Sequence, residues 1–259
     1  MALGAGLLKD LGRAVGEAAV STDAADLLAY SRDLWPRALI LLRSGRPAAH
    51  PPDAIAWPST VEQVRKVVRM LASAGVPIVP FGAGSGVCGG TVPVRGGVVV
   101  DMKRLSRIRS VDPEARLADV EAGIIGEDLE RSLARSGFTL GHFPSSMYCS
   151  SLGGWIATRS AGQTSTMYGK IEDMVSEIGF VAADGEHLVA RGRPGRGQGP
   201  GFCQLLVGTE GTCALITDAR LRIRPAPEAR RFRALRFADL ERGVDGVRKL
   251  MQAGVRPAV

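Results

Sequence analysis

Hydrophobic residues recur at helical spacing over residues 59–73, and this stretch gives the best-defined helix of the sequence. The apolar positions that share one helix face are Val61, Val64, Val67, Val68 and Leu71. Ser59 followed by Glu62 predicts a capping box at the start of this helix, because such side chains satisfy the unpaired N–H groups of a first turn. Gly75 and Pro77 predict its end.

The remaining pattern mixes short apolar runs with further helical periodicity. Strands are predicted over 76–80, 98–101, 174–181, 187–190, 205–208 and 215–223, with two more on either side of Asp112-Pro113. Helices are predicted over 126–136 and 153–161, and helical spacing also occurs within residues 1–50, before a linker rich in Pro and Ala over 45–58. The chain is therefore expected to contain both helices and strands; the α+β class is what the family resemblance described below implies.

The C-terminal pattern begins a new unit after Pro225 and Pro227. A strand over 232–237 and a helix over 239–252 are predicted, and another strand starts at Val255. A strand–helix–strand unit needs further strands with which to pair. We therefore expect the start of a second domain that is incomplete here, and a natural protein that is longer.

Composition excludes several classes of protein. The chain has 259 residues, enough for one large or two small domains, and 45% of them are hydrophobic. Its four Cys form no CxxC pair and its three His lie far apart, which excludes a zinc finger or a disulfide scaffold, and no metal site is predicted. Aromatic residues are only 5%, which disfavours a base-stacking nucleic-acid surface. No apolar run is long enough for a membrane span, so a cytoplasmic protein is expected.

The net charge of +7 is concentrated in one stretch. Residues 191–236 hold ten Arg against three acidic residues, which equals the excess of the whole chain. This excess indicates either a solvated face or a surface for an anionic partner, and the sequence leaves both interpretations open. Within the stretch, residues 191–201 are predicted to form a mobile loop rich in Gly, Arg and Pro.

A glycine-rich loop over residues 81–97, here called the glycine loop, is the strongest chemical signal. Its segment Gly84–Gly89 matches GxGxxG, but no helix opens after it and no acidic residue ends a second strand at the expected distance, so a Rossmann site is disfavoured. No GK[ST] follows, which excludes a Walker loop. Successive small residues with free N–H groups still favour an anion-binding nest, with Ser85 as a further donor. The alternative is a hairpin end that binds nothing.

Three segments resemble one family. PFGAGSGVCGGTVP (80–93), GHFPSSMYCSSLGGWIATRSAGQ (141–163) with YGKIEDMV (168–175), and LLVGTEGTCALIT (205–217) are similar, in order, to the FAD-binding segments of the vanillyl-alcohol-oxidase, or PCMH-type, superfamily. The likeness is closest to the alkylglycerone-phosphate synthase branch and next to the glycolate oxidase and D-lactate dehydrogenase branch. It implies a PCMH-type FAD-binding domain of two α/β subdomains, followed by the start of a truncated cap domain.

The resemblance also implies domain bounds and binding roles. The expected division is a helical segment over 1–50, the FAD-binding domain over 51–227 and an incomplete cap over 228–259. The first segment would bind the diphosphate, through Pro80, Phe81, Gly82, Ala83, Gly84, Ser85 and Gly86. The second would line the flavin and ribityl side, through Ser145, Ser146, Met147, Tyr148, Cys149, Ser150, Ser151, Gly153, Gly154, Thr158, Arg159, Ser160 and Ala161. The third would close over the adenine end, through Glu210, Gly211, Thr212, Cys213, Ala214, Leu215 and Ile216.

Individual side chains refine this expectation. Ser85 stands where another branch has the His that attaches FAD, and Cys149 is interpreted as a small apolar residue, so non-covalent FAD is expected. His142 is either a structural histidine or a catalytic base, and Tyr168 either packs or contacts the flavin. The family's acid–base groups lie mostly in the cap and the C-terminal region. The catalytic residues are therefore unknown.

The resemblance implies one of two reactions at flavin N5. A 2-hydroxy acid would be oxidised, or the acyl group of an acylglycerone phosphate would be exchanged for an alkyl group. A truncated FAD-binding module without turnover is the alternative. The expected partner is a small, anionic substrate, the oligomer considered is a homodimer, and no nucleic acid or transmembrane segment is expected.

Overall fold

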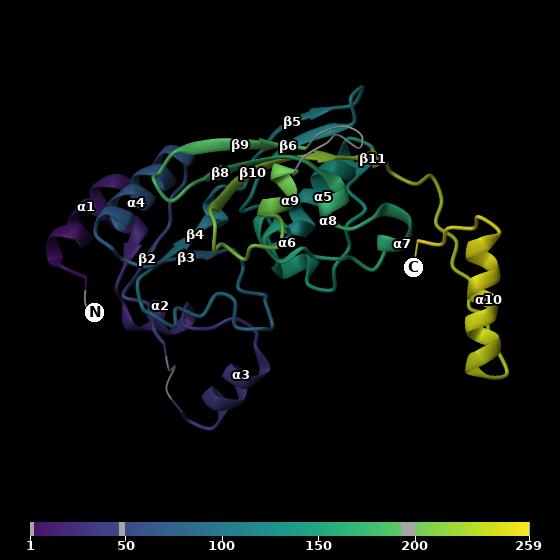
Figure 1. Cartoon of the computed structure of the whole chain (residues 1–259), viewed down its shortest axis with the longest axis horizontal. Helices are drawn as coiled ribbons and strands as arrows, with labels where there is room; N and C mark the ends of the chain where they lie inside the picture. The colour runs from purple at the N-terminus through teal and green to yellow at the C-terminus, as the bar shows by residue number, and fades with distance from the viewer. Residues whose placement is uncertain (1–2, 47–49, 193–200, 259) are drawn as a thin grey trace.

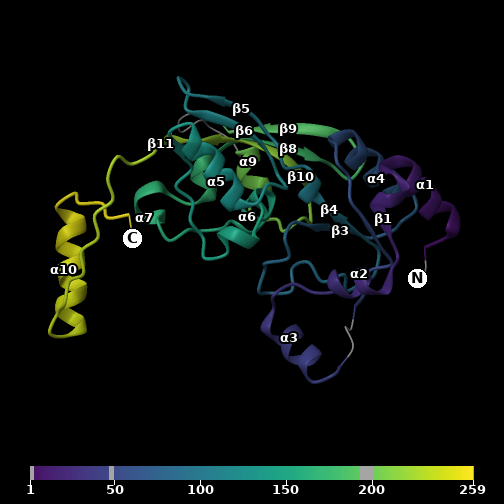
Figure 2. The same ribbon diagram turned by 180° about the vertical axis from the view of Figure 1, so that it is seen from behind.

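The computed structural model describes residues 3–46, 50–192 and 201–258. Two α/β subdomains lie side by side, and a C-terminal helix stands away from both (Figures 1 and 2). We call residues 3–104 the first subdomain and residues 108–225 the second subdomain. The predicted loop over 191–201 falls largely outside the described residues.

The first subdomain is built on a four-stranded sheet of order β1-β2-β4-β3. Its elements are α1 (Ala5–Val15), η1 (Glu17–Ala19), β1 (Val20–Ser21), α2 (Ala24–Ala29), α3 (Pro36–Arg43), β2 (Ala54–Ala56), α4 (Val61–Ser73), β3 (Ile78–Phe81), β4 (Val98–Asp101) and η2 (Met102–Arg104). Strands β2, β4 and β3 are parallel, and β1 joins the edge antiparallel to β2. Strand β4 is buried along its whole length, as expected for the interior of a parallel sheet, and has the predicted bounds.

Helix α4 confirms the predicted helix but shifts its cap by one residue. Thr60, rather than Ser59, is the N-cap, and its hydroxyl accepts a hydrogen bond from the N–H of Gln63 at 3.2 Å. The Gln63 side chain in turn accepts from the N–H of Ser59 at 2.7 Å. Glu62 instead pairs with Arg65 on the surface, because it lies at the second helical position, where its carboxylate faces solvent.

The N-terminal residues form part of the first subdomain core. Leu11 and Val15 of α1 are buried and belong to the same hydrophobic cluster as Val67 and Leu71 of α4. Strand β1 pairs with β2, placing Val20 opposite Ala56. The segment predicted as helical therefore also contributes an edge strand.

The second subdomain is an antiparallel five-stranded sheet of order β5-β6-β10-β8-β9 with helices on one face (Figure 1). Its elements are β5 (Ile108–Asp112), β6 (Leu117–Glu121), α5 (Gly126–Arg135), β7 (Phe138–Thr139), η3 (Met147–Cys149), α6 (Leu152–Thr158), α7 (Ser165–Tyr168), α8 (Ile171–Met174), β8 (Val175–Val181), β9 (His187–Arg191), α9 (Phe202–Leu206), β10 (Leu215–Arg222) and β11 (Arg224–Pro225). Strand β11 pairs with β7 in a small separate ladder.

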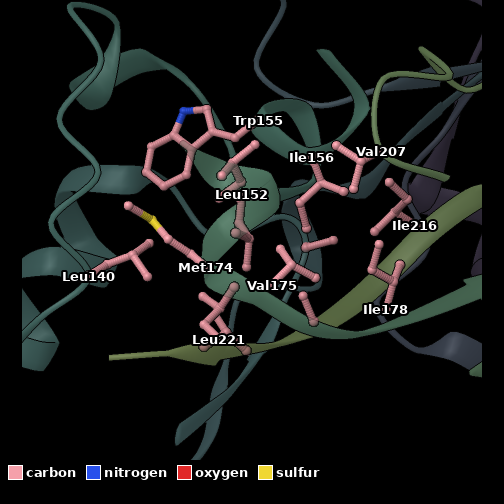
Figure 3. Packing of buried hydrophobic residues seen from close by; sticks show 14 of the residues in the cluster. Leu140, Leu152, Trp155, Ile156, Met174, Val175, Ile178, Val207, Ile216 and Leu221 are labelled. Atoms are coloured by element: carbon pink, nitrogen blue, oxygen red, sulfur yellow. The ribbon is translucent and has the colours of Figure 1, made fainter. Parts of the chain in front are cut away.

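The two faces of this sheet differ in chemistry. Apolar side chains of β8 and β10 pack under α6, as Figure 3 shows for Leu152 and Ile156 above the two strands. On the opposite face of the sheet, Arg220 of β10 lies between Asp119 of β6 and Glu177 of β8. The N–O distances are 2.8 Å to Asp119 and 3.2 Å to Glu177. Hydrogen bonding to Arg220 lowers the pKa of Asp119. Part of the arginine excess of the sequence is therefore neutralised across the strands.

Three predicted strands are wrong. Residues 205–208 overlap helix α9, because Cys203 and Leu206 are the buried positions and their spacing of three fits a helical turn. Residues 232–237 form no strand, and Phe232 is 89% exposed, because no neighbouring strand is available to pair with them. The strand expected from Val255 is likewise absent over the described residues to 258.

The predicted C-terminal helix is confirmed. Helix α10 (Leu240–Gln252) begins at Asp239, whose carboxylate accepts from the N–H of Arg242 at 2.8 Å. None of its residues is buried, and it lies apart from both subdomains (Figure 1). Across the described ranges, no helix is long and apolar enough to cross a membrane.

Replacing Leu11 by Ala tests whether α1 is integral to the first subdomain. The fully buried side chain leaves a cavity when it is removed, so the free energy of unfolding should fall by about 2–5 kcal/mol in urea denaturation. The control is Leu28→Ala on α2, whose side chain is about half exposed and whose removal should cost less than about 1 kcal/mol. Equal, small effects of both substitutions would contradict the packing described.

Candidate functional site

The three segments singled out in the sequence meet at one cavity of about 390 Å³ between the subdomains. The glycine loop begins where β3 ends, at the carboxyl edge of the parallel strands, where α/β proteins commonly bind ligands. The predicted residues that line the cavity are Pro80, Phe81, Gly82, Ala83, Gly84, Ser85, Gly86, Ser146, Ser150, Ser151, Gly153, Gly154, Thr158, Ser160, Glu210, Gly211, Ala214 and Ile216.

The glycine loop presents a series of free donors to this cavity. Among the described residues, no acceptor takes a hydrogen bond from the backbone N–H groups of residues 83–87 or from the Ser85 hydroxyl. Gly84 has a φ of +66°, and a Cβ on it would lie 2.6 Å from the ring of Phe81. The turn is therefore closed to larger residues on its inner side, while its N–H groups are available to an anion.

The second segment approaches the glycine loop at van der Waals distance. Gly82 lies directly against the Ser151 hydroxyl, and a Cβ at this glycine would collide with that oxygen. Ser151 is buried and is the N-cap of α6, where its hydroxyl accepts from the N–H of Gly154 at 3.3 Å. The start of α6 is thus fixed beside the loop by the absence of a side chain at residue 82.

The third segment is attached to both of the others. The N–H of Glu210 donates to the carbonyl of Ala157 in α6 at 2.9 Å, with Glu210 itself at a φ of +49°. Gly211 lies next to the ring of Pro80, where an added Cβ would be 2.7 Å away. The cavity wall is therefore continuous from β3 through α6 to the turn before β10.

Some predicted residues do not line the cavity. They are Ser145, Met147, Tyr148, Cys149, Arg159, Ala161, Thr212, Cys213 and Leu215. Tyr148 is 71% exposed, and the Arg159 guanidinium faces α9, where it donates to the carbonyl of Val207 at 2.9 Å. Leu215 packs in the first subdomain core, because neighbouring residues of a strand point to opposite faces and Ile216 takes the cavity side.

The cavity also contains residues that the sequence did not single out. They are Asp33, Val87, Cys88, Gly90, Thr91, Met102, Ala122, Trp155 and Ala157. Residues 87–91 continue the glycine loop, so their part in the wall could have been inferred from Gly89 and Gly90. Asp33 lies far away in the sequence, and no local pattern points to it.

A second hollow, of about 520 Å³, lies between β5 and α5. Its wall includes Lys103, Ser106, Asp128 and Ser132, but none of the residues predicted for the site. The smaller cavity is the candidate site, because it alone combines the glycine loop with the turns before α6 and β10.

Residues 52–191 match the family described as "FAD binding domain". The chain belongs to this family. Alkyldihydroxyacetonephosphate synthase of Caenorhabditis elegans is 34% identical over 224 residues, which cover 85% of this chain and 37% of that protein. The glycolate oxidase subunit GlcD of Bacillus subtilis is 31% identical over 208 residues, covering 80% of this chain and 44% of that subunit.

A solved structure of an alkyldihydroxyacetonephosphate synthase has a TM-score of 0.87 to this chain at 29% identity, and covers 99% of this chain and 51% of its own. The comparisons confirm the PCMH-type fold, FAD as the cofactor and the resemblance to the synthase and glycolate oxidase branches. The chain spans less than half the length of these curated relatives.

The residues at the cavity fit FAD. A diphosphate needs several hydrogen-bond donors and little steric bulk, and the free N–H groups of residues 83–87 supply both. The buried Thr91 hydroxyl on the cavity wall has no partner among the described residues, so it is free to bind a ligand. Ser146 and Ser160 offer further hydroxyls for a polyol chain or ring oxygens, whereas the Ser150 hydroxyl donates to the carbonyl of Ser146 at 2.8 Å and accepts from the Trp155 indole at 2.7 Å.

His142 lies behind this wall rather than in it. Its side chain is 1% exposed, its ring edge packs on Trp155, and its Nε2 lies 3.2 Å from the Ser160 hydroxyl. Its Nδ1 has no partner in the described part of the chain. Burial lowers the pKa of His142 to about 4, so the imidazole is neutral at pH 7. The contact with Ser160 connects His142 to a residue of the cavity wall.

The lowered pKa of His142 predicts a loss of stability in acid. Between pH 6.5 and 4 the unfolded chain takes up a proton that the folded chain excludes, so the contribution is complete above pH 6.5 and is lost as the pH falls. From pH 7 to 4.5 the wild-type chain should lose roughly 2–3 kcal/mol of unfolding free energy more than His142→Gln loses. Urea denaturation at both values measures this difference. The control His50→Gln replaces an exposed histidine, and its unfolding free energy should fall between pH 7 and 4.5 by as much as that of the wild type.

Gly84→Val tests the glycine loop directly. A β-branched side chain at a φ of +66° would be strained and would collide with Phe81, so FAD affinity should fall by more than about tenfold. Gly75→Val is a matched control, because its φ is +65° but an added Cβ meets nothing within 4 Å. Flavin fluorescence titration gives both affinities, and circular dichroism checks the fold. A folded Gly84→Val protein that binds FAD as tightly as the control would exclude this loop as the diphosphate site.

Proposed function

We propose that the chain is the FAD-holding part of a flavoenzyme that acts on a small hydroxy acid or a glycerone phosphate-type substrate. The free N–H groups of residues 83–87 are the single observation that carries the proposal, because a row of unpaired donors on a cavity wall favours binding of an anion. The names of relatives from the synthase and glycolate oxidase groups support the choice of substrate class.

Each segment has a proposed part in holding FAD. The loop 80–86 holds the diphosphate through backbone N–H groups and the Ser85 hydroxyl. Of residues 145–151, Ser146, Ser150 and Ser151 lie at the flavin and ribityl side, where Ser146 offers a hydroxyl and Gly153-Gly154 allow the backbone to approach. Residues 158–161 adjoin the isoalloxazine, with Ser160 oriented by His142. Residues 210–216 close the adenine end.

When bound, FAD supplies a flavin N5 that accepts a hydride or forms an adduct with the substrate. The chain contributes a cavity wall of backbone and small side chains that positions the ring. Asp33 and Glu210 are the charged residues among those that line the described cavity, and both are acidic. An anionic substrate needs a cationic partner and a group that takes its proton. We infer that these groups lie outside the cavity wall described here.

A second candidate is an FAD-binding module without turnover of its own. The exposed apolar face of α10 favours it, because Leu240, Val244 and Val247 are each more than half exposed and have no cover in the described structure. In this case FAD would bind, but the chain would lack the groups that bind the substrate and move its proton.

Anaerobic flavin reduction separates these alternatives. The FAD-loaded chain should keep its yellow absorbance when it is mixed with D-lactate or glycolate, because the cavity wall contains no cation for the carboxylate. Dithionite should bleach the same sample, which verifies that the flavin is reducible. Bleaching by either hydroxy acid would show that the reacting groups lie within these 259 residues.

The substrate class is tested with a longer form of the same reading frame. Such a form should either reduce its flavin with a 2-hydroxy acid or convert an acylglycerone phosphate and a fatty alcohol to the alkyl product, detected by mass spectrometry. Failure of both reactions in an FAD-loaded longer form would favour the module without turnover.

A further inference from the structure

We propose that residues 30–35, here called the N-terminal clamp, hold the glycine loop in its ligand-binding shape, with Asp33 as the principal positioning residue. The inference rests on the proposed function, because the shape in question is the one that binds the diphosphate. The sequence separates the clamp from the loop by about fifty residues, and nothing in the family likeness assigns it a role.

Asp33 is a buried carboxylate whose two oxygens accept hydrogen bonds from backbone N–H groups. It is 2% exposed and forms no ion pair with any described residue. Its Oδ2 accepts a hydrogen bond from the N–H of Gly89 at 2.8 Å, and its Oδ1 accepts from the N–H of Trp35 at 2.9 Å. Burying a carboxylate is costly unless its oxygens accept hydrogen bonds. The N–H groups of Gly89 and Trp35 supply these bonds, so the carboxylate and the loop backbone stabilise each other.

Two further contacts of the clamp fix the same stretch of loop. The N–H of Leu34 donates to the carbonyl of Gly86 at 2.8 Å. The Trp35 ring covers Gly89, where an added Cβ would lie 3.2 Å from the ring and where φ is +80°. Residues 86 and 89 are therefore held from outside, through a carbonyl and an N–H that a ligand does not need.

The clamp also holds the beginning of the loop. The Tyr30 ring packs on Phe81 with centroids 4.7 Å apart, and its hydroxyl donates to Asp101 at 2.5 Å. Lys103 binds the same carboxylate oxygen at 2.5 Å and donates to the carbonyl of Gly82 at 2.9 Å. The loop is thus anchored at residues 81–82 and at residues 86–89.

This arrangement leaves the ligand donors free while it fixes their scaffold. The N–H groups of residues 83–85 lie between the two anchors and those of residues 86–87 lie within the second, and none of them has a partner among the described residues. A glycine-rich loop has high conformational freedom, and ordering it on binding would weaken affinity. The clamp removes part of this cost in advance, since the loop is already closed before the diphosphate arrives.

Replacing the charged Asp33 by Asn tests the clamp, because electrostatic repulsion and the clamp predict opposite changes in FAD affinity. Its carboxylate lies on the wall of a site for an anion, so simple repulsion predicts that Asp33→Asn binds FAD more tightly. The clamp predicts the reverse. An Asn side chain offers one acceptor oxygen and an NH₂ donor, so either Gly89 or Trp35 would face a donor instead of an acceptor.

The experiment measures FAD affinity and the exchange of loop amides in the cofactor-free chain. Asp33→Asn should weaken FAD binding by about tenfold, and hydrogen exchange in a peptide covering residues 84–91 should speed up before any FAD is added. Asp10→Asn is the control, because this carboxylate on α1 is exposed and pairs with Arg13 at 3.0 Å, outside the clamp. It should change neither readout. Tyr30→Phe, which keeps the ring and loses the bond to Asp101, should weaken FAD binding by several-fold.

The outcomes distinguish this inference from the proposed function. If the wild-type chain binds no FAD, the proposed function fails. If the wild-type chain binds FAD and the folded Asp33→Asn chain binds it equally or more tightly, the clamp is overturned. Faster exchange without weaker binding would also overturn it, because the loop would then be ordered at no cost to affinity. If Asp33→Asn does not fold, an unchanged affinity in Tyr30→Phe overturns the clamp.

Discussion

The contact between Gly82 and Ser151 is the constraint on which the site depends. One residue begins the glycine loop of the first subdomain and the other caps α6 of the second, so their contact determines how closely the two sheets approach. No side chain fits at residue 82, and the close approach leaves a cavity lined by backbone and small residues. A site of this kind recognises its ligand mainly by backbone donors.

No Lys or Arg is among the described residues that line that cavity. The arginine excess of the sequence is partly used on the sheet of the second subdomain, where Arg220 bridges Asp119 and Glu177 across three strands. Ion pairs at such half-exposed positions contribute little to stability. They do pair the charged side chains on the sheet face that points away from α6. The free N–H groups of the glycine loop are consequently the main attraction for an anion among the residues described at the cavity.

Two buried polar side chains, His142 behind the cavity wall and Asp33 on it, support the site. His142 remains neutral and touches Ser160, and Asp33 uses both oxygens on backbone N–H groups. Neither side chain needs to touch a ligand to matter, because each fixes a group that lines the cavity. Stability and binding are therefore coupled here. A change that disturbs the packing of residues 30–35 or of His142 should also lower the affinity for the cofactor.

The sequence by itself determined the elements whose signals are local. The apolar stripe of α4, the buried run of β4 and the carboxylate cap of α10 all follow from residues within one or two turns, and the glycine loop follows from composition. The three binding segments could be named because they resemble a family. Tertiary structure alone decided the rest. Residues 232–237 have strand propensity but no partner, and residues 205–208 have apolar character whose period is visible only once Cys203 is seen to be buried. The role proposed for Asp33 depends on a fold that brings residue 33 next to residue 89. The two residues lie 56 positions apart in the sequence, and no local pattern predicts a contact over that separation.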